Sequence, residues 1–319
     1  MLDTTDAALV RELQRDGRAS FQQLSELLGI SREAARARVT RLLQRGAVRI
    51  VGIVPPAVAG IAAVAHISLD LVGPGAPVAA AAAERRAVSF VSCTAGPQAV
   101  VVEVRAVDDA ALEREFTALR DLPGVRGTEV FRCAELVRDA YSPGPAPNTA
   151  QQDTARQDTA QQDTAPPDRT LRLDRVDRQL LGLLQADGRA SFAALSERVG
   201  LSQPATRARV LHLMESRAVH VTGLVATEAM GVREAAGIGL GVHGPVRAVA
   251  EAAAALPGVN YVATGYGRFD LVCGVDAPDR SALLAGLEAL RGLPGVARSE
   301  SWVHLAIVKE SYTYDLPME

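Results

Sequence analysis

Apolar residues recur at helical spacing along residues 31–45, where Ala35, Val39 and Leu42 share one face of a predicted helix. Ser31 stands directly before this run and has the side chain of a good N-cap. Most of the remaining surface carries arginines, at positions 32, 36, 38, 41 and 45. The pattern therefore predicts an amphipathic helix with one buried side and one positively charged side.

A shorter apolar run, Phe21 to Leu28, precedes this helix. Ser20 before it and Gln23 three residues later form a capping-box pattern, and Gly29 is placed to end the helix. Two helices joined by a tight glycine turn are typical of a helix-turn-helix, whose second helix enters the major groove of DNA.

The whole pattern occurs twice. Residues 16–21, DGRASF, are repeated at residues 187–192, and the same offset of 171 residues holds without a gap from Leu2 and Leu173 to Tyr141 and Tyr312. The matched unit is roughly 140 residues long, far beyond the 20 to 50 residues of a solenoid repeat. The sequence therefore indicates duplication of a complete unit.

Each unit continues with a β-rich half. Residues 3–15 predict a helix before the helix-turn-helix, and residues 47–54 predict a wing or hinge strand that ends at Pro55. Further strands are predicted at 64–72, 88–94, 100–106 and 125–137, with helices at 78–86 and around 112–119. This βαββαβ order is typical of the ferredoxin-like α+β fold, an antiparallel sheet with both helices on one face.

The expected organisation has five segments. They are a winged helix-turn-helix domain (1–54), a βαββαβ ligand-binding and dimerisation sandwich (60–144), a linker (145–170), a second winged helix-turn-helix domain (171–225) and a second βαββαβ domain (231–319). The linker repeats QDTA and has no apolar face, and about 26 such residues span roughly 25 to 30 Å, enough for the two halves to dock on one another.

Charge is concentrated locally. The net charge of −3 gives no overall attraction to DNA, but residues 31–49 contain six arginines and one acid, Glu33. The matched residues 202–220 contain three arginines and one acid. The first copy is therefore the stronger electrostatic candidate for a DNA-binding surface.

Composition favours a globular cytoplasmic protein, since 48% of residues are hydrophobic, 22% are charged, and neither a secretory leader nor a convincing membrane span is found. The three cysteines have no CxxC spacing and the five histidines have no metal-ligand spacing. We therefore expect no disulfide framework, metal, cofactor or catalytic residue.

The chain resembles the Lrp/AsnC (feast/famine) transcriptional regulators in both copies. The residues that carry the resemblance are Leu2-Asp3-x-x-Asp6, Asp16-Gly17-Arg18, Leu24-Ser25-x-x-Leu28-Gly29-Ile30-Ser31, Arg38-Val39 and Leu42, with Leu173-Asp174-x-x-Asp177, Leu201-Ser202 and Arg209-Val210 in the second copy. The resemblance implies a winged helix followed by a βαββαβ (RAM) module that self-associates and often binds an amino acid or other small effector. Two units in one chain then suggest an intramolecular pseudo-dimer with two recognition helices.

The predicted partner is double-stranded DNA. Arginine can pair with guanine through two hydrogen bonds, and phosphate contacts set the register. In the first copy we expect base contacts from Arg32, Glu33, Arg36 and Thr40, with Ser31 and the phosphate-facing Arg38, Arg41 and Arg45 beside them. Their counterparts are Ser202, Gln203, Pro204, Arg207 and Leu211, then Arg209 and His212. The alternative is a solvated helix face in a domain that mediates only protein contacts.

An effector site is suggested by the sequence TGYGRFD at residues 264–270, because family members carry a glycine and an aspartate in the loop between the second and third strands of the module. The candidate residues are Gly265, Gly267 and Asp270, whose carboxylate and nearby backbone N–H groups could hold an amino acid. The first copy has Ala99 where the acid would be, so any ligand is expected in the second module. The alternative is a tight turn in which Asp270 bonds to its own backbone.

Two other functions remain open. Siroheme decarboxylases resemble paired Lrp/AsnC units, but here the recognition helices keep their arginines and no His/Arg constellation stands out. An effector-binding module without DNA binding is the third hypothesis, and salt-dependent DNA affinity would exclude it.

Overall fold

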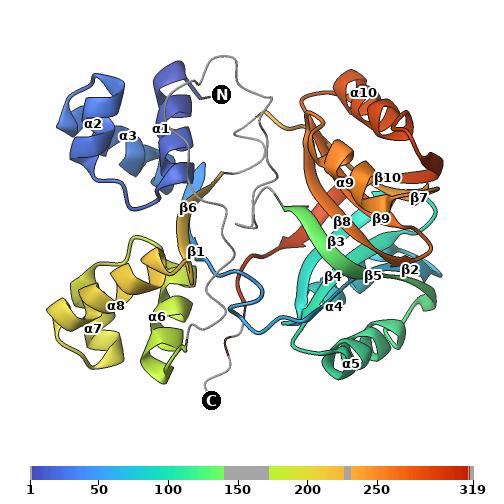
Figure 1. The fold of residues 1–319 in the computed structure, drawn as a ribbon, viewed down its shortest axis with the longest axis horizontal. Helices are drawn as coiled ribbons and strands as arrows, with labels where there is room; N and C mark the ends of the chain where they lie inside the picture. The colour runs from blue at the N-terminus through green and yellow to red at the C-terminus, as the bar shows by residue number, and fades with distance from the viewer. Residues whose placement is uncertain (1, 140–171, 226–230, 315, 317–319) are drawn as a thin grey trace. The chain divides into compact units, whose positions relative to one another are not determined.

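The computed structural model describes residues 2–139, 172–225, 231–314 and 316, which form two compact units (Figure 1). One unit combines residues 1–59, 167–232 and 313–319, and the other combines residues 60–166 and 233–312. We call them the helix-turn-helix unit and the barrel unit. Each contains the corresponding half of both sequence copies, so like domains pair with like. The predicted linker, residues 145–170, lies outside the described residues.

The helix-turn-helix unit contains the predicted helices in both copies. Their bounds are α1 Thr4–Arg15, α2 Phe21–Leu28 and α3 Arg32–Gln44, then α6 Arg175–Ala186, α7 Phe192–Val199 and α8 Gln203–Glu215. The capping box of Ser20 and Gln23 is present, and Gly29 ends α2 in the left-handed conformation, with φ of 63°. Both sequence signals are confirmed.

The predicted hinge strands pair with each other. β1 (Val48–Ile53) and β6 (His220–Val225) form a two-stranded antiparallel sheet. Val221 and Val225 of β6 belong to the hydrophobic core of the first copy, where they join residues of α1 and α3. Each copy therefore completes its core with a strand from the other copy, which makes the two helix-turn-helices one folding unit.

The barrel unit consists of two modules with the predicted βαββαβ order. The first module contains β2 Ala63–Leu71, α4 Gly75–Ala83, β3 Val88–Ala95, β4 Val100–Ala106, α5 Asp109–Arg120 and β5 Val125–Asp139. The second contains β7 Glu234–Val242, α9 Val246–Ala254, β8 Val259–Gly267, β9 Leu271–Ala277, α10 Arg280–Arg291 and β10 Val296–Glu310.

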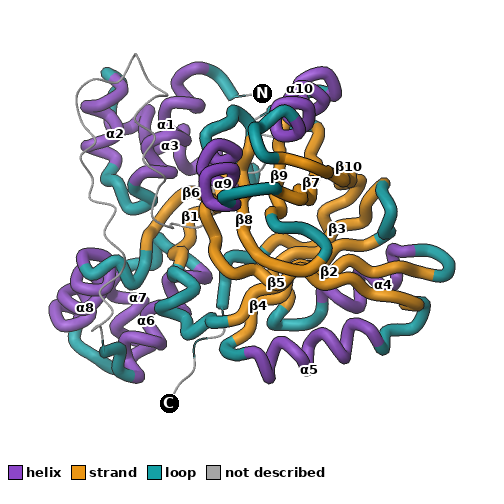
Figure 2. Tube along the Cα trace, turned by 45° about the vertical axis from the view of Figure 1, so that its right-hand side comes forward, coloured by secondary structure: helices purple, strands orange, loops and turns teal. Residues whose placement is uncertain are grey.

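The two antiparallel sheets close into one eight-stranded barrel in the order β10-β3-β4-β2-β5-β8-β9-β7. The last strand of each module pairs with the second strand of the other, as β5 with β8 and β10 with β3. Figure 2 shows the helices of the two modules on opposite outer sides of this barrel. Full closure removes the exposed sheet edges that the separate modules would have.

Three cores hold the barrel unit together. One lies between sheet and helices in each module, as the ferredoxin-like fold requires, and the third joins residues of both modules, including Phe131, Phe269 and Trp302. The sheet face that carries no helix is thus the surface through which the modules meet.

No helix in the described part of the chain is long and apolar enough to cross a membrane. Within the same residues, no group of three or more His, Cys, Asp or Glu side chains is placed to hold a metal ion.

Candidate nucleic-acid interface and effector site

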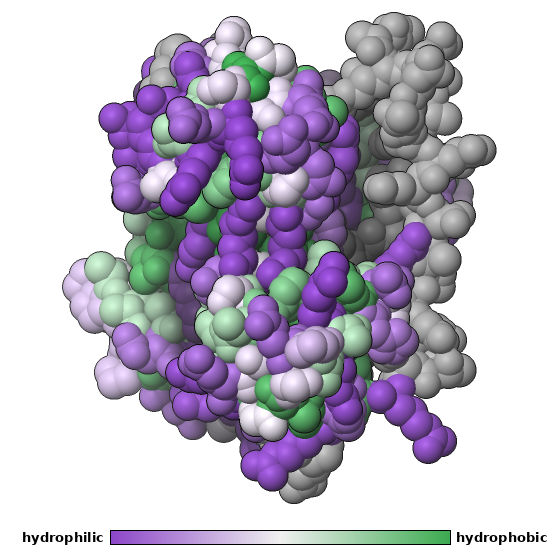
Figure 3. Space-filling view, turned by 90° about the vertical axis from the view of Figure 1, so that its left-hand side faces the viewer, coloured by the Kyte–Doolittle hydropathy of each residue, from purple (hydrophilic) through white to green (hydrophobic). Residues whose placement is uncertain are grey.

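Both recognition helices bury one face and expose the other. In α3 the buried residues are Ala35, Val39 and Leu42, and in α8 they are Thr206, Val210 and Leu213. The predicted base-contacting residues lie on the exposed faces: Arg32, Glu33, Arg36 and Thr40 of α3, and Gln203, Pro204, Arg207 and Leu211 of α8. Figure 3 shows hydrophilic side chains gathered over this side of the helix-turn-helix unit.

Two of the arginines assigned to phosphates are engaged inside the domain. Arg38 lies 2.7 Å from carboxylate oxygens of both Asp3 and Asp6, and Arg41 lies 2.8 Å from Asp6. Hydrogen bonding from Arg38 lowers the pKa of the Asp3 carboxyl, and the same bonds raise the pKa of Arg38. These contacts anchor α3 to the start of α1, a structural role that was not predicted.

The second copy repeats this anchor. Arg209 lies 2.6 Å from Asp174 and 2.7 Å from Asp177, the counterparts of Asp3 and Asp6. His212, which stands where the first copy has Arg41, is exposed. The LD-x-x-D motif at the start of each copy therefore serves to hold the recognition helix, and phosphate contacts from Arg38, Arg41 and Arg209 stay predictions.

Four predicted DNA-contacting arginines have no such partner. Among the described residues, no ion pair or hydrogen bond engages the side chains of Arg32, Arg36, Arg45 or Arg207, and all four are exposed. Ser31 and Ser202 cap their helices by accepting hydrogen bonds from the backbone N–H groups of Ala34 and Ala205. The first copy thus presents three unengaged guanidinium groups on or directly after α3, and the second copy presents one on α8.

The repeated Asp-Gly-Arg motif joins the two helix-turn-helices. Arg18 donates hydrogen bonds to the carbonyls of Gly188 at 2.7 Å and Ala190 at 3.0 Å, and its guanidinium lies 4.9 Å from the ring centre of Phe192. Arg189 makes the matching contacts with the Ala19 carbonyl at 2.8 Å and the Phe21 ring at 5.2 Å.

The glycine of this motif is needed for the close approach. A Cβ atom on Gly17 would lie 2.8 Å from the side chain of Ile50 and 3.0 Å from the backbone of β6. The repetition of DGRASF was noticed in the sequence, but its role between the copies could not be read from one copy alone.

Of the residues predicted to bind an effector, Asp270 lies in the expected loop between β8 and β9, whereas the two glycines lie in a strand. Gly265 and Gly267 belong to β8 and pair with β5, and Cβ atoms there would lie 2.2 Å and 2.3 Å from the carbonyl oxygens of Arg132 and Val130. The glycines thus permit close strand pairing between modules. The carboxylate of Asp270 accepts a 2.8 Å hydrogen bond from the backbone N–H of Val242, so it bonds to β7 and not to its own backbone. Their role in ligand binding stays a prediction.

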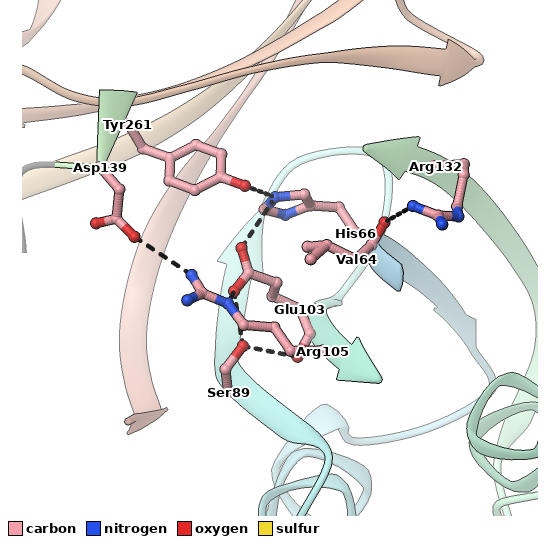
Figure 4. Close-up of polar contacts among 8 residues, drawn as sticks. All are labelled: Val64, His66, Ser89, Glu103, Arg105, Arg132, Asp139 and Tyr261. Carbon is pink, nitrogen blue, oxygen red and sulfur yellow. Dashed lines mark hydrogen bonds and ion pairs between the residues drawn. The ribbon is translucent and has the colours of Figure 1, made fainter. Parts of the chain in front are cut away.

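A polar cluster that the sequence did not reveal lies in the barrel unit (Figure 4). The carboxylate of Glu103 lies 2.6 Å from Arg105 and 3.3 Å from Nε2 of His66, and it accepts a 2.6 Å hydrogen bond from Ser89. Nε2 of His66 lies 2.8 Å from the hydroxyl of Tyr261, which belongs to the second module.

Electrostatics within this cluster favour the ion pair. Burial by itself would raise the pKa of the Glu103 carboxyl, but the charge of Arg105 and hydrogen bonds from His66 and Ser89 hold it well below its usual value. Burial, with the charge of Glu103, raises the pKa of the Tyr261 hydroxyl. No His/Arg constellation stands out in the sequence, because the residues that meet in this cluster are up to 195 positions apart.

A cavity of about 20 Å³ adjoins the cluster, and His66, Phe131, Arg268, Phe269 and Trp302 are among its lining residues. This volume holds one water-sized molecule. It is too small for a free amino acid in the geometry described.

Comparison with known proteins identifies both halves of the repeated unit. The AsnC-type helix-turn-helix domain matches residues 2–43 and 173–214, and the Lrp/AsnC ligand binding domain matches residues 236–314. The HTH-type transcriptional regulator Rv2324 of Mycobacterium tuberculosis is 36% identical over 138 residues, which are 42% of this chain and 93% of that protein. LrpA of the same organism is 34% identical over 128 residues, which are 39% of this chain and 85% of that protein.

A solved structure, the siroheme decarboxylase NirDL, is similar along almost the whole chain. The TM-score is 0.65 with 13% sequence identity, and the match covers 97% of this chain and 93% of that one. At this identity the similarity shows the shared fold alone. The domain matches, and the regulators to which the sequence is similar, place this chain in the Lrp/AsnC family of helix-turn-helix transcriptional regulators, with the helix-turn-helix domain matched twice in one polypeptide.

Proposed function

We propose that one chain acts as an intramolecular pseudo-dimer that reads two unequal DNA half-sites and regulates transcription. The observation that carries this proposal is the joined helix-turn-helix unit, in which Arg18 and Arg189 connect the two helix-turn-helices that carry the exposed recognition helices. Half-sites about one helical turn apart, or a multiple of that, suit such a pair.

Two different recognition helices imply an asymmetric operator, whose two half-sites differ in sequence. Helix α3 presents Arg32 and Arg36 at the expected base edges, whereas the matched positions of α8 hold Gln203 and Arg207. Arginine favours guanine and glutamine favours adenine, because each matches the hydrogen-bonding pattern of that base. The first helix-turn-helix should therefore contribute more of the affinity and prefer the more guanine-rich half-site.

The test begins with DNA selected from a random pool by the full chain. Replacement of Arg36 or Arg207 by alanine should weaken binding by roughly 1 to 3 kcal/mol for each lost bidentate contact, and relax the preference in one half-site only. Arg120→Ala, at an exposed position on α5, is the control and should bind normally. Unchanged affinity in both recognition-helix variants, or affinity independent of salt, would reject the proposal.

An effector in the second module is part of the same proposal. Its support is the match of the ligand binding domain to residues 236–314 and the presence of Asp270 in that module, where the first has Ala99. Calorimetry with each of the twenty amino acids should give binding that Asp270→Ala abolishes and the exposed control Asp121→Ala leaves intact. Binding that survives Asp270→Ala would place the ligand elsewhere.

We do not assign the decarboxylase activity of the structural neighbour. The cavity beside His66 measures about 20 Å³, so a tetrapyrrole could not occupy that cavity in the geometry described. Titration of the full chain with iron uroporphyrin, followed by visible absorbance, tests this directly. A saturable spectral shift that His66→Ala removes would favour the enzymatic function.

A further inference from the structure

The two modules contribute different residues at matched positions of the barrel. His66 and Glu103 of the first module face each other across β2 and β4. Their counterparts, 171 residues later, are Gly237 and Gly274, which face each other across β7 and β9. One module thus contributes a large polar pair where the other contributes two glycines.

The polar pair is completed by a residue found only in the opposite module. His66 contacts the hydroxyl of Tyr261 at 2.8 Å, and the two rings meet edge to face with centres 5.1 Å apart. The first-module counterpart of Tyr261 is Phe90, which has no hydroxyl group. If two first modules paired with each other, neither would present a tyrosine hydroxyl to His66 of its partner.

The glycines are equally specific to their module. A Cβ atom on Gly237 would lie 2.2 Å from the indole ring of Trp302, and one on Gly274 would lie 2.4 Å from the side chain of Asn260. Trp302 is 8% exposed and stands where the first module has Phe131. The space that His66 and Glu103 occupy in one module is therefore filled by different side chains in the other.

A third difference lies at the loop after β8. Arg268 lies 2.7 Å from Glu129 of the first module and 2.5 Å from Glu300 of its own module. The two glutamates are counterparts of each other, but the counterpart of Arg268 is Pro97. A single arginine thus neutralises both acids, and only the second module supplies it.

We propose that the barrel-forming faces are a heterotypic recognition surface, on which a first module accepts a second module and rejects another first module. Two first modules would bury two copies of Glu103, leave each His66 without the tyrosine hydroxyl, and leave the Glu129 side chains without arginine. Two second modules would leave each Tyr261 hydroxyl without its histidine partner. The partner of each module is then the opposite module of the same chain, which closes the barrel through β5 with β8 and β10 with β3.

The test exchanges matched residues within the full chain. A first-type chain carries Gly237→His, Tyr261→Phe, Gly274→Glu, Asp276→Arg and Trp302→Phe, and a second-type chain carries His66→Gly, Phe90→Tyr, Glu103→Gly, Arg105→Asp and Phe131→Trp. The exchanged chain carries all ten substitutions. Thermal unfolding followed by circular dichroism gives the midpoint of each, and light scattering gives its mass.

The first-type and second-type chains, in which the two modules have been made alike, are called the equalised chains. Both should melt at least about 5 °C below the wild type, as expected when two or more kilocalories per mole are lost from a domain of this size. The exchanged chain should recover part of that loss, because its faces are again complementary. A loss in the exchanged chain equal to the sum of the other two, or equalised chains as stable as the wild type, would overturn the proposal.

A milder pair of variants keeps the proposal testable if the multiple variants do not fold. Tyr261→Phe should lower the midpoint in the wild-type background and have at least a twofold smaller effect when His66 is already alanine, because the hydroxyl then has lost its partner. Leu284→Glu makes an exposed position of α10 identical to Glu113 and should leave the midpoint unchanged. Equal effects of Tyr261→Phe in both backgrounds would contradict the proposed contact.

Discussion

The helix-turn-helix pair has stayed nearly symmetric, whereas the barrel pair has diverged. Arg18 and Arg189 reach across to each other's copy in opposite directions, with two carbonyl hydrogen bonds from Arg18 and one from Arg189, and the backbone N–H groups of Gly17 and Gly188 make matching bonds to Val221 and Ile50. In the barrel, His66 faces Tyr261 while the matched residues are Gly237 and Phe90. The same duplication thus has two outcomes within one molecule.

The difference has a physical cause. Contacts away from a pseudo-twofold axis can be made twice by identical residues, because each residue meets a different neighbour. Inside a closed barrel, side chains of both modules share one interior, so buried charges without partners and side chains without space are costly. After two gene copies are fused, each copy can accumulate its own substitutions. One module can then carry small residues at positions where the other carries large ones.

The largest predicted effect comes from breaking the buried ion pair of the barrel. Glu103→Ala leaves the guanidinium of Arg105, a residue only 7% exposed, without its closest carboxylate. We expect a loss of about 3 to 5 kcal/mol in the free energy of unfolding, measured by urea titration with fluorescence of Trp302, the only tryptophan in the sequence.

Glu113→Ala is the matched control for this change, because Glu113 is an exposed residue of α5 in the same module. It should change the free energy of unfolding by less than about 0.5 kcal/mol. A Glu103→Ala variant as stable as this control would mean that Arg105 finds full compensation from Asp139, 3.3 Å away.

The second effect is a loss of stability in mild acid. Burial, with a contribution from the nearby His66, lowers the pKa of His304 to about 4 from its ordinary value of 6.5. The folded state therefore prefers neutral His304, so its stability is complete above pH 6.5 and falls as the pH drops toward 4. Between pH 7 and pH 5 the loss from His304 should be about 2 kcal/mol.

The variant His304→Gln tests this assignment, since glutamine can still bond to the Ser92 hydroxyl, which lies 2.9 Å from the histidine ring. Urea titrations at both pH values should show a smaller acid loss in this variant than in the wild type. An unchanged pH dependence would assign the acid sensitivity to other groups.

A third effect is expected where Arg18 and Arg189 join the two helix-turn-helices. Arg18→Ala removes two hydrogen bonds to carbonyl groups and the contact with Phe192. We expect a loss of about 1 to 3 kcal/mol in unfolding free energy, and binding to paired half-sites should weaken more than binding to either half-site alone. Arg189→Ala should lower the unfolding free energy by less, because Arg189 donates to one carbonyl, that of Ala19, where Arg18 donates to two. A larger loss for Arg189→Ala than for Arg18→Ala would contradict this difference.

Local structure was predictable from sequence, but contacts between the copies were not. Ser20, Gln23 and Gly29 predict the ends of α2 because capping depends on neighbouring residues alone. Gly265 and Gly267 match a family loop in sequence, yet in the structure they lie in a strand whose neighbour, β5, comes from the other module. Pairing at this distance leaves no periodic signal, since it is determined by how the two modules close the barrel.

The same limit explains the arginines of the recognition helices. Spacing placed Arg38 and Arg41 on the charged side of α3, but only the packed domain brings Asp6 within 2.8 Å of both. A charged side chain on a helix can face DNA or a neighbouring helix, and periodicity cannot separate the two. The LD-x-x-D motif was the available signal, because its acids recur with the arginine in both copies.

The smallest predicted effect separates these two roles. Arg38→Ala removes the ion pairs of Arg38 with Asp3 and Asp6 and keeps the Arg41–Asp6 pair, so it should loosen the start of α1 and slightly lower the melting midpoint. Arg36→Ala leaves that anchor intact and should leave the midpoint unchanged while DNA binding falls. If Arg38 acts through the anchor, its loss of affinity will carry no change in the salt slope, whereas loss of a phosphate contact lowers the slope by about 0.9. A lower slope for Arg38→Ala would show that this arginine leaves the aspartates when DNA is bound.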